Sequence, residues 1–309
     1  MQQSAPEGVD ISAIIVNYNG GRYLAECLQA LRAASGGLSV ETIIVDNGST
    51  DESVNTLAQA EHAGTTVIQA GRNLGFGRAN NLGAAQASGR DYLLLNTDCF
   101  LRAGSLEALI AALEGTPGCG IVGPRLLNSD GTLQPSCHNF PSPLVLFIEQ
   151  SLLWKLLRRL PLINELLFIA SGHKSKKPVD WLAGACLLVR SELYKALGGF
   201  DERFFFYWEE ADLCLQVKEQ GWTVLFEPGA EAVHLGGGST TNPNLLVQFF
   251  RSLYLFYRKH YSRRQLLAAR AVTRVMALFK AARLLRPKAD ENRHASLSEA
   301  AAWVRVFRL

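Results

Sequence analysis

The fold is decided by residues 11–31, which read ISAIIVNYNGGRYLAECLQAL. The β-branched run at 11–16 predicts a strand, and N-Y-N-G at 17–20 predicts the turn that ends it. Apolar residues then recur at helical spacing, at Tyr23, Cys27, Leu28 and Leu31. A strand, a loop and a helix in this order form the basic unit of an α/β domain.

The same unit recurs twice further along the chain. The run at 42–45 leads into the turn D-N-G-S, and the run at 92–95 leads into N-T-D, each before a predicted helix. We therefore expect an α/β fold with a mostly parallel, twisted sheet and helices on both faces. Ligands bind at the carboxyl ends of strands in such sheets, so Asp46 and Asp98 are the first candidate site residues.

The repeat of strand, loop and helix does not continue after Pro141. Residues 144–160 predict a basic amphipathic helix, and 171–178 predict a mobile loop. The other expected elements are strands at 181–189 and 223–226, a helix at 209–220, and helical structure from 238 to 286.

The composition is that of a globular protein without a dominant charge. The chain has 309 residues, of which 48% are hydrophobic and 19% charged, and its formal net charge is +3. The charge is uneven, because residues 232–289 hold eleven of the 31 basic residues and none of the 28 acidic ones. The six cysteines are scattered without a zinc or C-x-x-C pattern, which favours a reduced, cytoplasmic setting.

Several function classes lack support in the sequence. No basic and apolar leader precedes residue 11, and no run of about 20 apolar residues could span a bilayer. The P-loop pattern is absent, and the nearest dinucleotide fingerprint, at Gly75 and Gly77, has Asn80 in place of its third glycine. There is no G-x-S-x-G elbow of a serine hydrolase.

Two aspartates at strand ends have two interpretations each. The Asp98 carboxylate follows a buried strand, where it suits a hard divalent cation shared with a diphosphate. N-T-D is equally explained as an Asx turn that caps the next helix. Asp46 has the same structural alternative.

The richest segment, F-F-F-Y-W-E-E-A-D-L-C at 204–214, places three carboxylates directly after five aromatic residues. On a helix, Glu210 shares a face with apolar residues, whereas Glu209 and Asp212 lie on a polar face. A carboxylate on an apolar wall tends to have a raised pKa, which suits a general base. The alternative is a set of acids that interact with the helix dipole.

His234 follows a predicted strand and precedes Gly236. A lone histidine there is more often structural than a ligand, but together with Asp98 it would suit a cation such as Mn²⁺.

Six motifs in order give the sequence a specific resemblance. They are I-I-V-N-Y-N-G (14–20), V-D-N-G-S-T-D (45–51), N-L-G-F-G-R-A-N-N (73–81), L-L-N-T-D (94–98), W-L-A-G-A-C-L-L-V-R (181–190) and F-Y-W-E-E-A-D-L-C-L (206–215). Together they resemble the family 2 glycosyltransferases of GT-A fold, with the strongest likeness to the bacterial rhamnosyltransferase-like branch. The likeness covers about residues 11–260.

The resemblance implies a domain organisation and a nucleotide-sugar site. It implies a catalytic domain at 1–243, with a nucleotide-binding half at 1–125 and an acceptor half at 126–243 that carries an amphipathic insertion at 141–177, and then a basic helical region at 244–309. Asp46 would hydrogen-bond a pyrimidine base. The other implied nucleotide-sugar contacts are Asn17, Tyr18, Asn73, Asn80, Asn96 and Asp98.

The resemblance also implies the catalytic machinery. N-T-D at 96–98 stands in place of the family's D-x-D motif, so Asp98, with His234 as a further ligand, would hold Mn²⁺ or Mg²⁺. Glu210 occupies the position of the catalytic base, where the family usually has an aspartate. The implied acceptor contacts are Trp181, Gly184, Ala185, Trp208, Glu209 and Asp212.

We therefore expect a metal-dependent, inverting glycosyltransferase that uses a dTDP- or UDP-sugar, with dTDP-L-rhamnose favoured, in cell-surface polysaccharide synthesis. The acceptor would be a saccharide or a lipid-linked saccharide. The alternatives are a sugar-nucleotide nucleotidyltransferase and a non-catalytic sugar-nucleotide-binding protein.

The basic C-terminal helices suit peripheral contact with the inner face of the cytoplasmic membrane. A solvated helix packed on the catalytic domain explains them equally well. No nucleic-acid partner is expected, because no compact nucleic-acid module accompanies the charge.

Overall fold

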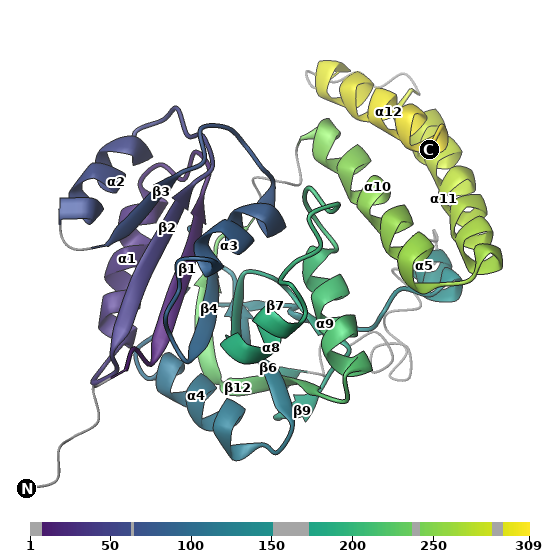
Figure 1. The fold of residues 1–309 in the computed structure, drawn as a ribbon. Helices are drawn as coiled ribbons and strands as arrows, with labels where there is room; N and C mark the ends of the chain where they lie inside the picture. Colours follow the sequence, from purple (N-terminus) through teal and green to yellow (C-terminus); the bar gives the residue numbers. More distant parts are fainter. Residues whose placement is uncertain (1–7, 63–64, 151–172, 237–241, 286–292) are drawn as a thin grey trace, which may run out of the picture. The chain divides into compact units, whose positions relative to one another are not determined.

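The computed structural model describes residues 8–62, 65–150, 173–236, 242–285 and 293–309 (Figure 1). The chain forms two compact units. Unit 1 comprises the described parts of Met1–Asn139, Ala170–Phe205 and Glu209–Leu235, and unit 2 those of Phe140–Ile169, Phe206–Trp208 and Gly236–Leu309. The predicted domain boundaries at 125 and 243 stay predictions.

Unit 1 is an α/β layer structure around a mixed sheet. Among the described residues the sheet has ten strands, with the order β3-β2-β1-β4-β11-β6-β12-β5 along its main path. These strands are β1 (Ile11–Asn17), β2 (Val40–Asp46), β3 (Thr66–Gln69), β4 (Asp91–Asn96), β5 (Cys99–Leu101), β6 (Cys119–Leu127), β11 (Cys186–Arg190) and β12 (Thr223–His234). The short strands β7 (Leu133–Gln134) and β9 (Lys177–Pro178) pair with β6 and β12. β8 (Cys137–His138) and β10 (Trp181–Leu182) form a separate pair.

The parallel part of the sheet is the predicted repeat of strand and helix. β1 lies parallel to β2 and β4, and β2 lies parallel to β3. β11 is antiparallel to both β4 and β6, and β5 is antiparallel to β12. The predicted α/β class with a mostly parallel sheet is therefore confirmed, and the reversal begins at β11.

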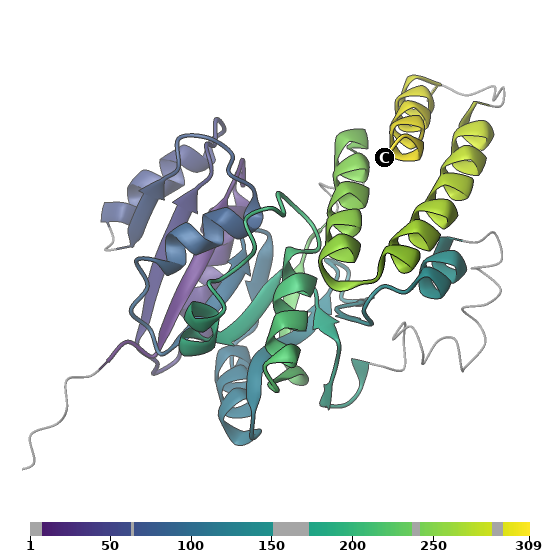
Figure 2. The same ribbon diagram turned by 45° about the vertical axis from the view of Figure 1, so that its right-hand side comes forward.

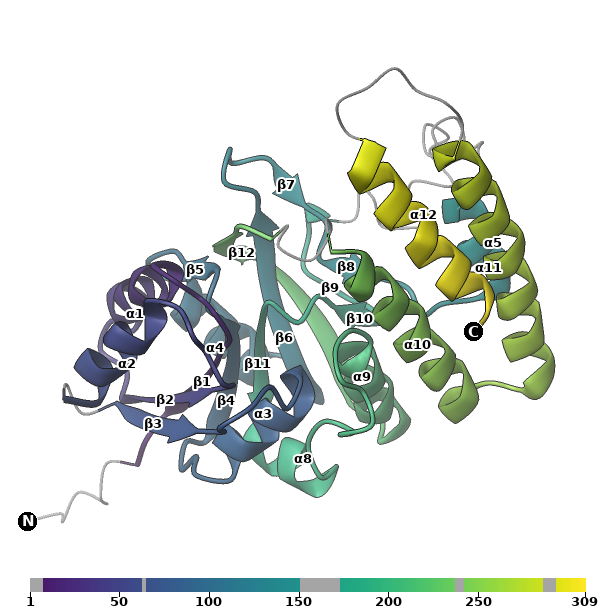
Figure 3. The same ribbon diagram turned by 90° about the horizontal axis from the view of Figure 1, so that it is seen from above.

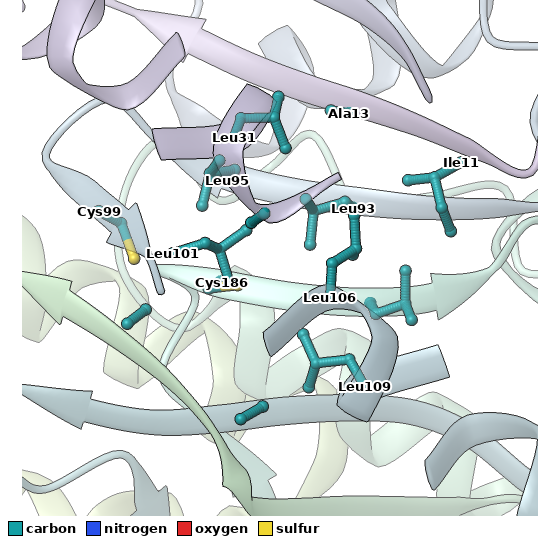
Figure 4. Close-up of a cluster of buried hydrophobic side chains, with 14 of the residues drawn as sticks. Ile11, Ala13, Leu31, Leu93, Leu95, Cys99, Leu101, Leu106, Leu109 and Cys186 are labelled. Atoms are coloured by element: carbon teal, nitrogen blue, oxygen red, sulfur yellow. The ribbon is translucent and has the colours of Figure 1, made fainter. Parts of the chain in front are cut away.

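Helices cover both faces of this sheet (Figure 3). α1 (Tyr23–Ala34) and α4 (Ser105–Gly115) bury leucines against the strand residues that face them, and Figure 4 shows Leu31, Leu106 and Leu109 in this core. α3 (Phe76–Ala84) packs on the opposite face of β1 and β2. It approaches closely because Gly83 has no side chain, since a β-carbon there would lie 2.6 Å from Ile14 Cγ2. The remaining helices of unit 1 are α2 (Ser53–His62), α8 (Ser191–Ala196) and α9 (Glu209–Glu219).

The regular elements in the described residues of unit 2 are helices: α5 (Pro143–Gln150), α10 (Pro243–His260), α11 (Arg263–Leu284) and α12 (Arg293–Phe307). α10, α11 and α12 pack on one another (Figure 2). Trp303 of α12 lies 5.7 Å from Phe250 of α10 between ring centroids. Because both helices bury aromatic residues at this contact, the hydrophobic effect holds them together.

Several predicted boundaries need correction. The strand expected at 181–189 is two strands, β10 and β11, in different sheets. Part of the expected loop at 171–178 is the strand β9, which pairs with β12. The strand expected at 223–226 continues to His234 through an irregularity between Glu227 and Glu231.

The observed helices also differ in length from the predicted ones. The amphipathic helix expected at 144–160 is described only as α5, and the rest of that range lies outside the described residues. The C-terminal helical stretch is interrupted at Ser262, which begins α11 with a capping box to Gln265.

The six cysteines are all buried free thiols. Within the described part of the chain, no helix is both long and apolar enough to cross a bilayer.

Candidate active site

The strand register aligns the first candidate residues at one edge of the sheet. Asn17, the last residue of β1, pairs with Asp46, the last residue of β2. On the other side of β1, Val16 pairs with Asn96, the last residue of β4. The last residues of these parallel strands therefore lie at one edge of the sheet, with Asn17 level with Asp46 and Asn96 one residue further back.

Asn17 organises the loop after β2. Its side chain is fully buried, and the two hydrogens of its Nδ2 face three acceptors within hydrogen-bonding distance: Asp46 Oδ1 (3.2 Å), Ser49 Oγ (2.8 Å) and Ser53 Oγ (3.0 Å). The backbone N–H of Ser49 also donates to Asp46 Oδ1. Within the described residues no hydrogen bond reaches Asp46 Oδ2, so this oxygen stays available to a ligand. Tyr18, by contrast, is half exposed beside this network.

Asn47 joins this loop to the N-L-G-F-G segment. Its Oδ1 accepts from Leu74 N (2.7 Å), and its Nδ2 donates to Asn73 Oδ1 (3.1 Å) and Gly75 O (3.2 Å). Gly48 has a φ of +83°, and a β-carbon there would meet the Arg72 backbone at 2.9 Å. Only glycine fits this close approach. Asn73 thus lies beside the Asp46 loop, whereas Asn80 is buried within α3 and donates to Phe76 O.

The structure brings Asp98 and His234 together. β5 pairs antiparallel with the end of β12, so that His234 faces Cys99, and Leu235 N donates to Asp98 O (3.0 Å). His234 Nε2 lies 3.4 Å from Asp98 Oδ1, and both side chains are partly exposed. Residues more than a hundred positions apart in sequence therefore face each other because of strand pairing.

The Asp98 and His234 pair fits a divalent cation. Neighbouring ligands of an octahedral ion, each at about 2.1 Å, are about 3 Å apart, close to the observed separation of the two side-chain atoms. The described residues contain no group of three or more His, Cys, Asp or Glu side chains that could hold a metal. The remaining positions would be filled by diphosphate oxygens and water, as is usual for an ion shared with a nucleotide.

Glu210, in α9, lies near the same edge of the sheet because it packs against Gly184, just before β11. The Asn96 N–H donates to Ala185 O (3.0 Å), which ties the end of β4 to the start of β11. Glu210 lies against the adjoining Gly184, where a β-carbon would lie 3.4 Å from Glu210 Cβ and 3.6 Å from its Cδ. The Glu210 carboxyl group is therefore held next to the strand end that leads to Asp98. Ala185 itself is buried.

The predicted faces of α9 are wrong. Glu209 and Asp212 were expected on a polar face, yet both are buried, whereas Glu210 is partly exposed. The reason is that α9 packs against α3 on one side and against β10, β12 and β6 on another, so most of its circumference is covered. Asp212 accepts a hydrogen bond from Gln216 Nε2 (2.7 Å), which compensates its burial.

The two predicted tryptophans lie in different units. In unit 1, Trp181 donates from Nε1 to Asn139 O (2.9 Å) and stacks on His138 with ring centroids 4.2 Å apart. In unit 2, Trp208 packs against Phe249 and Phe256 of α10. Tyr207 and Trp208 both have positive φ angles, 68° and 71°, which are strained for aromatic residues.

Sequence reasoning missed three residues that contact the candidate site residues. Asn47 lies in the quoted V-D-N-G-S-T-D motif, but only the structure shows that its amide bonds to the loop at 73–75. His138 has no local motif, and its stacking partner Trp181 is 43 positions away. Gln134 contacts His234, with 2.6 Å between Gln134 Oε1 and His234 Nδ1. A single sequence contains no signal for either of these long-range contacts.

The comparisons with known proteins all identify glycosyltransferases as similar to this chain. The model of the family "Glycosyl transferase family 2" matches residues 12–175. An N-acetylglucosaminyl-diphospho-decaprenol L-rhamnosyltransferase of Mycobacterium tuberculosis is 31% identical over 269 residues, which cover 82% of this chain and 85% of that protein. The rhamnosyltransferase WbbL of Escherichia coli is 26% identical and covers 86% and 98% of the two chains.

Solved structures with the same fold are more distant in sequence. A mannosyltransferase of Pyrobaculum calidifontis, in complex with GDP-Man and Mn²⁺, superposes with a TM-score of 0.55 at 14% identity and covers 99% of this chain and 89% of that one. GalNAc-T7 with UDP, GalNAc and Mn²⁺ gives a TM-score of 0.56 at 14% identity, and there the match spans about half of the longer chain, 55%. These likenesses establish the GT-A fold.

Proposed function

Because the chain belongs to glycosyl transferase family 2, we propose that it transfers L-rhamnose from dTDP-L-rhamnose, with inversion at the anomeric carbon. The acceptor we propose is an N-acetylglucosaminyl diphospho-polyprenol, the class named for the relative from M. tuberculosis. Such a reaction would serve cell-surface polysaccharide synthesis at the cytoplasmic face of the membrane.

The single observation that carries the proposal is the shared sheet edge. Asp98 and His234 face each other at 3.4 Å, and Glu210 lies against Gly184, whose neighbour Ala185 is hydrogen-bonded to the β4 end. A pair of cation ligands and a carboxylate are what transfer from a nucleoside diphosphate sugar requires. All of these residues belong to unit 1.

A divalent cation, when bound by Asp98 and His234, would stabilise the negative charge that develops on the leaving diphosphate. Glu210 takes the proton of the acceptor hydroxyl as that oxygen attacks the anomeric carbon. The new carbon–oxygen bond forms while the bond to the diphosphate breaks, so dTDP leaves and the proton stays on Glu210. With one carboxylate acting as base and none as nucleophile, a single displacement inverts the configuration.

The nucleotide would occupy the edge formed by β1 and β2. Asp46 Oδ1 is engaged by Asn17 and Ser49, which leaves Oδ2 to accept the N3–H of thymine. Tyr18 is half exposed beside it and offers a ring for base stacking. Asn73 completes this part of the proposed site.

Two other functions would give different reaction products. A nucleotidyltransferase would release inorganic diphosphate from a nucleoside triphosphate, and a non-catalytic binding protein would release nothing. The test is incubation of the protein with a panel of nucleotide sugars and Mn²⁺ or Mg²⁺, with nucleoside diphosphate release as the readout. Release of dTDP from dTDP-rhamnose that depends on a GlcNAc-diphospho-lipid supports the proposal, whereas inorganic diphosphate release from triphosphates contradicts it.

We also propose that unit 2 contacts the membrane through α11. Large apolar side chains of this helix leave more than half of their surface exposed: Leu267, Val275, Leu278 and Phe279. Exposed arginines accompany them at Arg264, Arg274 and Arg283. Apolar side chains flanked by basic ones suit a surface of anionic lipids. A second copy of the same helix suits this face less well, because two such positive faces repel each other.

A further inference from the structure

The turn between β6 and β7 is fixed by its own hydrogen bonds. Asn128 N donates to Thr132 O (2.8 Å), and Gly131 N donates to Asn128 O (2.9 Å). Asp130 Oδ1 accepts from both the N–H and the hydroxyl of Thr132. Because β6 also pairs with β12, this hairpin is attached to the strand that ends at His234.

Two backbone carbonyls decide the orientation of the side-chain amides on this hairpin. Gln134 Nε2 lies 3.1 Å from His234 O and 3.0 Å from Asn128 Oδ1, and Asn128 Nδ2 lies 3.4 Å from Leu133 O. A carbonyl oxygen can only accept, so an amide nitrogen must face it. Rotating either amide by half a turn would place two oxygens against each other. Gln134 Oε1 therefore points away from these carbonyls.

The partner of Gln134 Oε1 is His234 Nδ1, at 2.6 Å. Since this oxygen is an acceptor, His234 Nδ1 must carry a hydrogen and donate it. In the neutral imidazole the lone pair then lies on Nε2, which is the atom that faces Asp98 Oδ1 at 3.4 Å. Either a proton on Nε2 or a cation between the two atoms balances this contact.

We propose that Gln134 is a positioning residue for the cation site. It holds His234 as the Nδ1–H tautomer, so that the Nε2 lone pair faces the Asp98 carboxylate, and Asn128 in turn orients the Gln134 amide. Hydrogen bonds from outside the ligand set commonly fix the tautomer and direction of a metal-binding histidine. The inference rests on the cation role of Asp98 and His234 in the proposed function, and it adds a residue to that same site.

The test compares Gln134→Met, which keeps the side-chain length but removes the acceptor, with the wild type. The first readout is the tautomer of His234, measured through its ¹⁵N shifts at alkaline pH and assigned with His234→Ala. The wild type should show the Nδ1–H form, and Gln134→Met should move toward the Nε2–H form. The second readout is affinity for Mn²⁺ alone, which should fall about 10- to 100-fold.

Gln248→Met is the matched control, because Gln248 donates to Ser252 within α10 of unit 2, whereas the hairpin belongs to unit 1. It should leave both readouts unchanged. Asn128→Leu removes the oxygen that orients the Gln134 amide and should cause a smaller change of the same kind. An unchanged tautomer and unchanged Mn²⁺ affinity in Gln134→Met would overturn the inference. Both readouts need no sugar donor, so failure of the rhamnosyl transfer assay alone would contradict the proposed function and leave this inference standing.

Discussion

Glu210 packs directly on Gly184: a β-carbon added to Gly184 would lie 3.4 Å from Glu210 Cβ and 3.5 Å from its Cγ. Gly184 adjoins Ala185, whose carbonyl accepts the hydrogen bond of Asn96 N. The position of the proposed base is thus defined by the start of β11 rather than by α9 alone. This contact gives a direct way to displace the carboxylate without removing it.

A larger side chain at position 184 should reduce turnover in proportion to its size. In Gly184→Ala the added methyl makes an ordinary van der Waals contact, so turnover should stay within a fewfold of the wild type. In Gly184→Val the extra methyl groups overlap the Glu210 side chain and should move its carboxyl group, which should lower kcat by at least about tenfold. Measured dTDP affinity should stay the same in both variants, and equal kcat values for Ala and Val would contradict the proposed contact.

The proposed cation ligands should act as a pair. Asp98→Asn and His234→Ala should each weaken Mn²⁺ binding at least about tenfold, because each removes one of the two protein ligands. The double variant should weaken it by less than the product of the two single effects, since the two residues serve one ion. Titration of Mn²⁺ in the presence of dTDP gives these values. Fully multiplicative effects would mean that the two side chains act independently.

The apolar face of α11 should determine membrane binding. Leu278→Glu combined with Phe279→Glu places charge among side chains that are exposed by 54% and 65%, so the fold should be kept while lipid contact is lost. Sedimentation with phosphatidylglycerol vesicles should fall at least about tenfold relative to the wild type. Val54→Glu, at a residue exposed by 45% on α2, is the control and should sediment as the wild type does. Retained sedimentation of the double variant would assign membrane contact to another surface.

Glu41 should make the stability of the chain depend on pH in the acid range. Burial alone would raise the pKa of Glu41, but hydrogen bonds from the Ser12 hydroxyl, from Ser88 and from the Gly89 N–H outweigh it and lower the pKa. A folded-state pKa below the unfolded one contributes stability that is complete above the unfolded pKa and is lost as pH falls through the folded pKa.

Glu41→Gln should therefore lower the free energy of unfolding by about 1 to 2 kcal/mol at neutral pH, as expected for hydrogen bonds to a charged group. The difference from the wild type should vanish in acid. Urea unfolding across the pH range measures it, with Glu26→Gln as the control, since Glu26 forms an exposed pair with Arg22. A pH-independent difference would show that the carboxylate charge is not involved.

Much of the fold was predictable because the repeated strands have strong local patterns. The β-branched run at Ile11–Asn17 and the buried run at Asp91–Asn96 are strands within one or two residues of the prediction. Asp98, which follows the second of these strands, and Asp46, at the end of β2, were recognised from turn chemistry and from the geometry of parallel sheets. Local pattern was sufficient for these two strands, but it did not identify β6, which is buried along almost its whole length.

Prediction failed where tertiary packing overrides local pattern. Helical spacing placed Glu209 and Asp212 on a polar face, but elements distant in sequence pack on several sides of α9 and bury both. β5 has only three residues, too few for a periodic signal, yet its pairing with β12 is what places His234 beside Asp98. The contact of Gln134 with His234 spans 100 positions, so no local rule could have found it.

The most direct test of the central claim is rhamnosyl transfer from dTDP-rhamnose to a GlcNAc-diphospho-polyprenol by Glu210→Gln, measured beside dTDP binding to the same variant. Glu219→Gln is the control, at an exposed residue of the same helix. The account predicts that Glu210→Gln binds dTDP and Mn²⁺ as the wild type does and loses turnover by about 10²-fold or more, as expected for removal of a general base. Turnover at the wild-type rate in Glu210→Gln would contradict it.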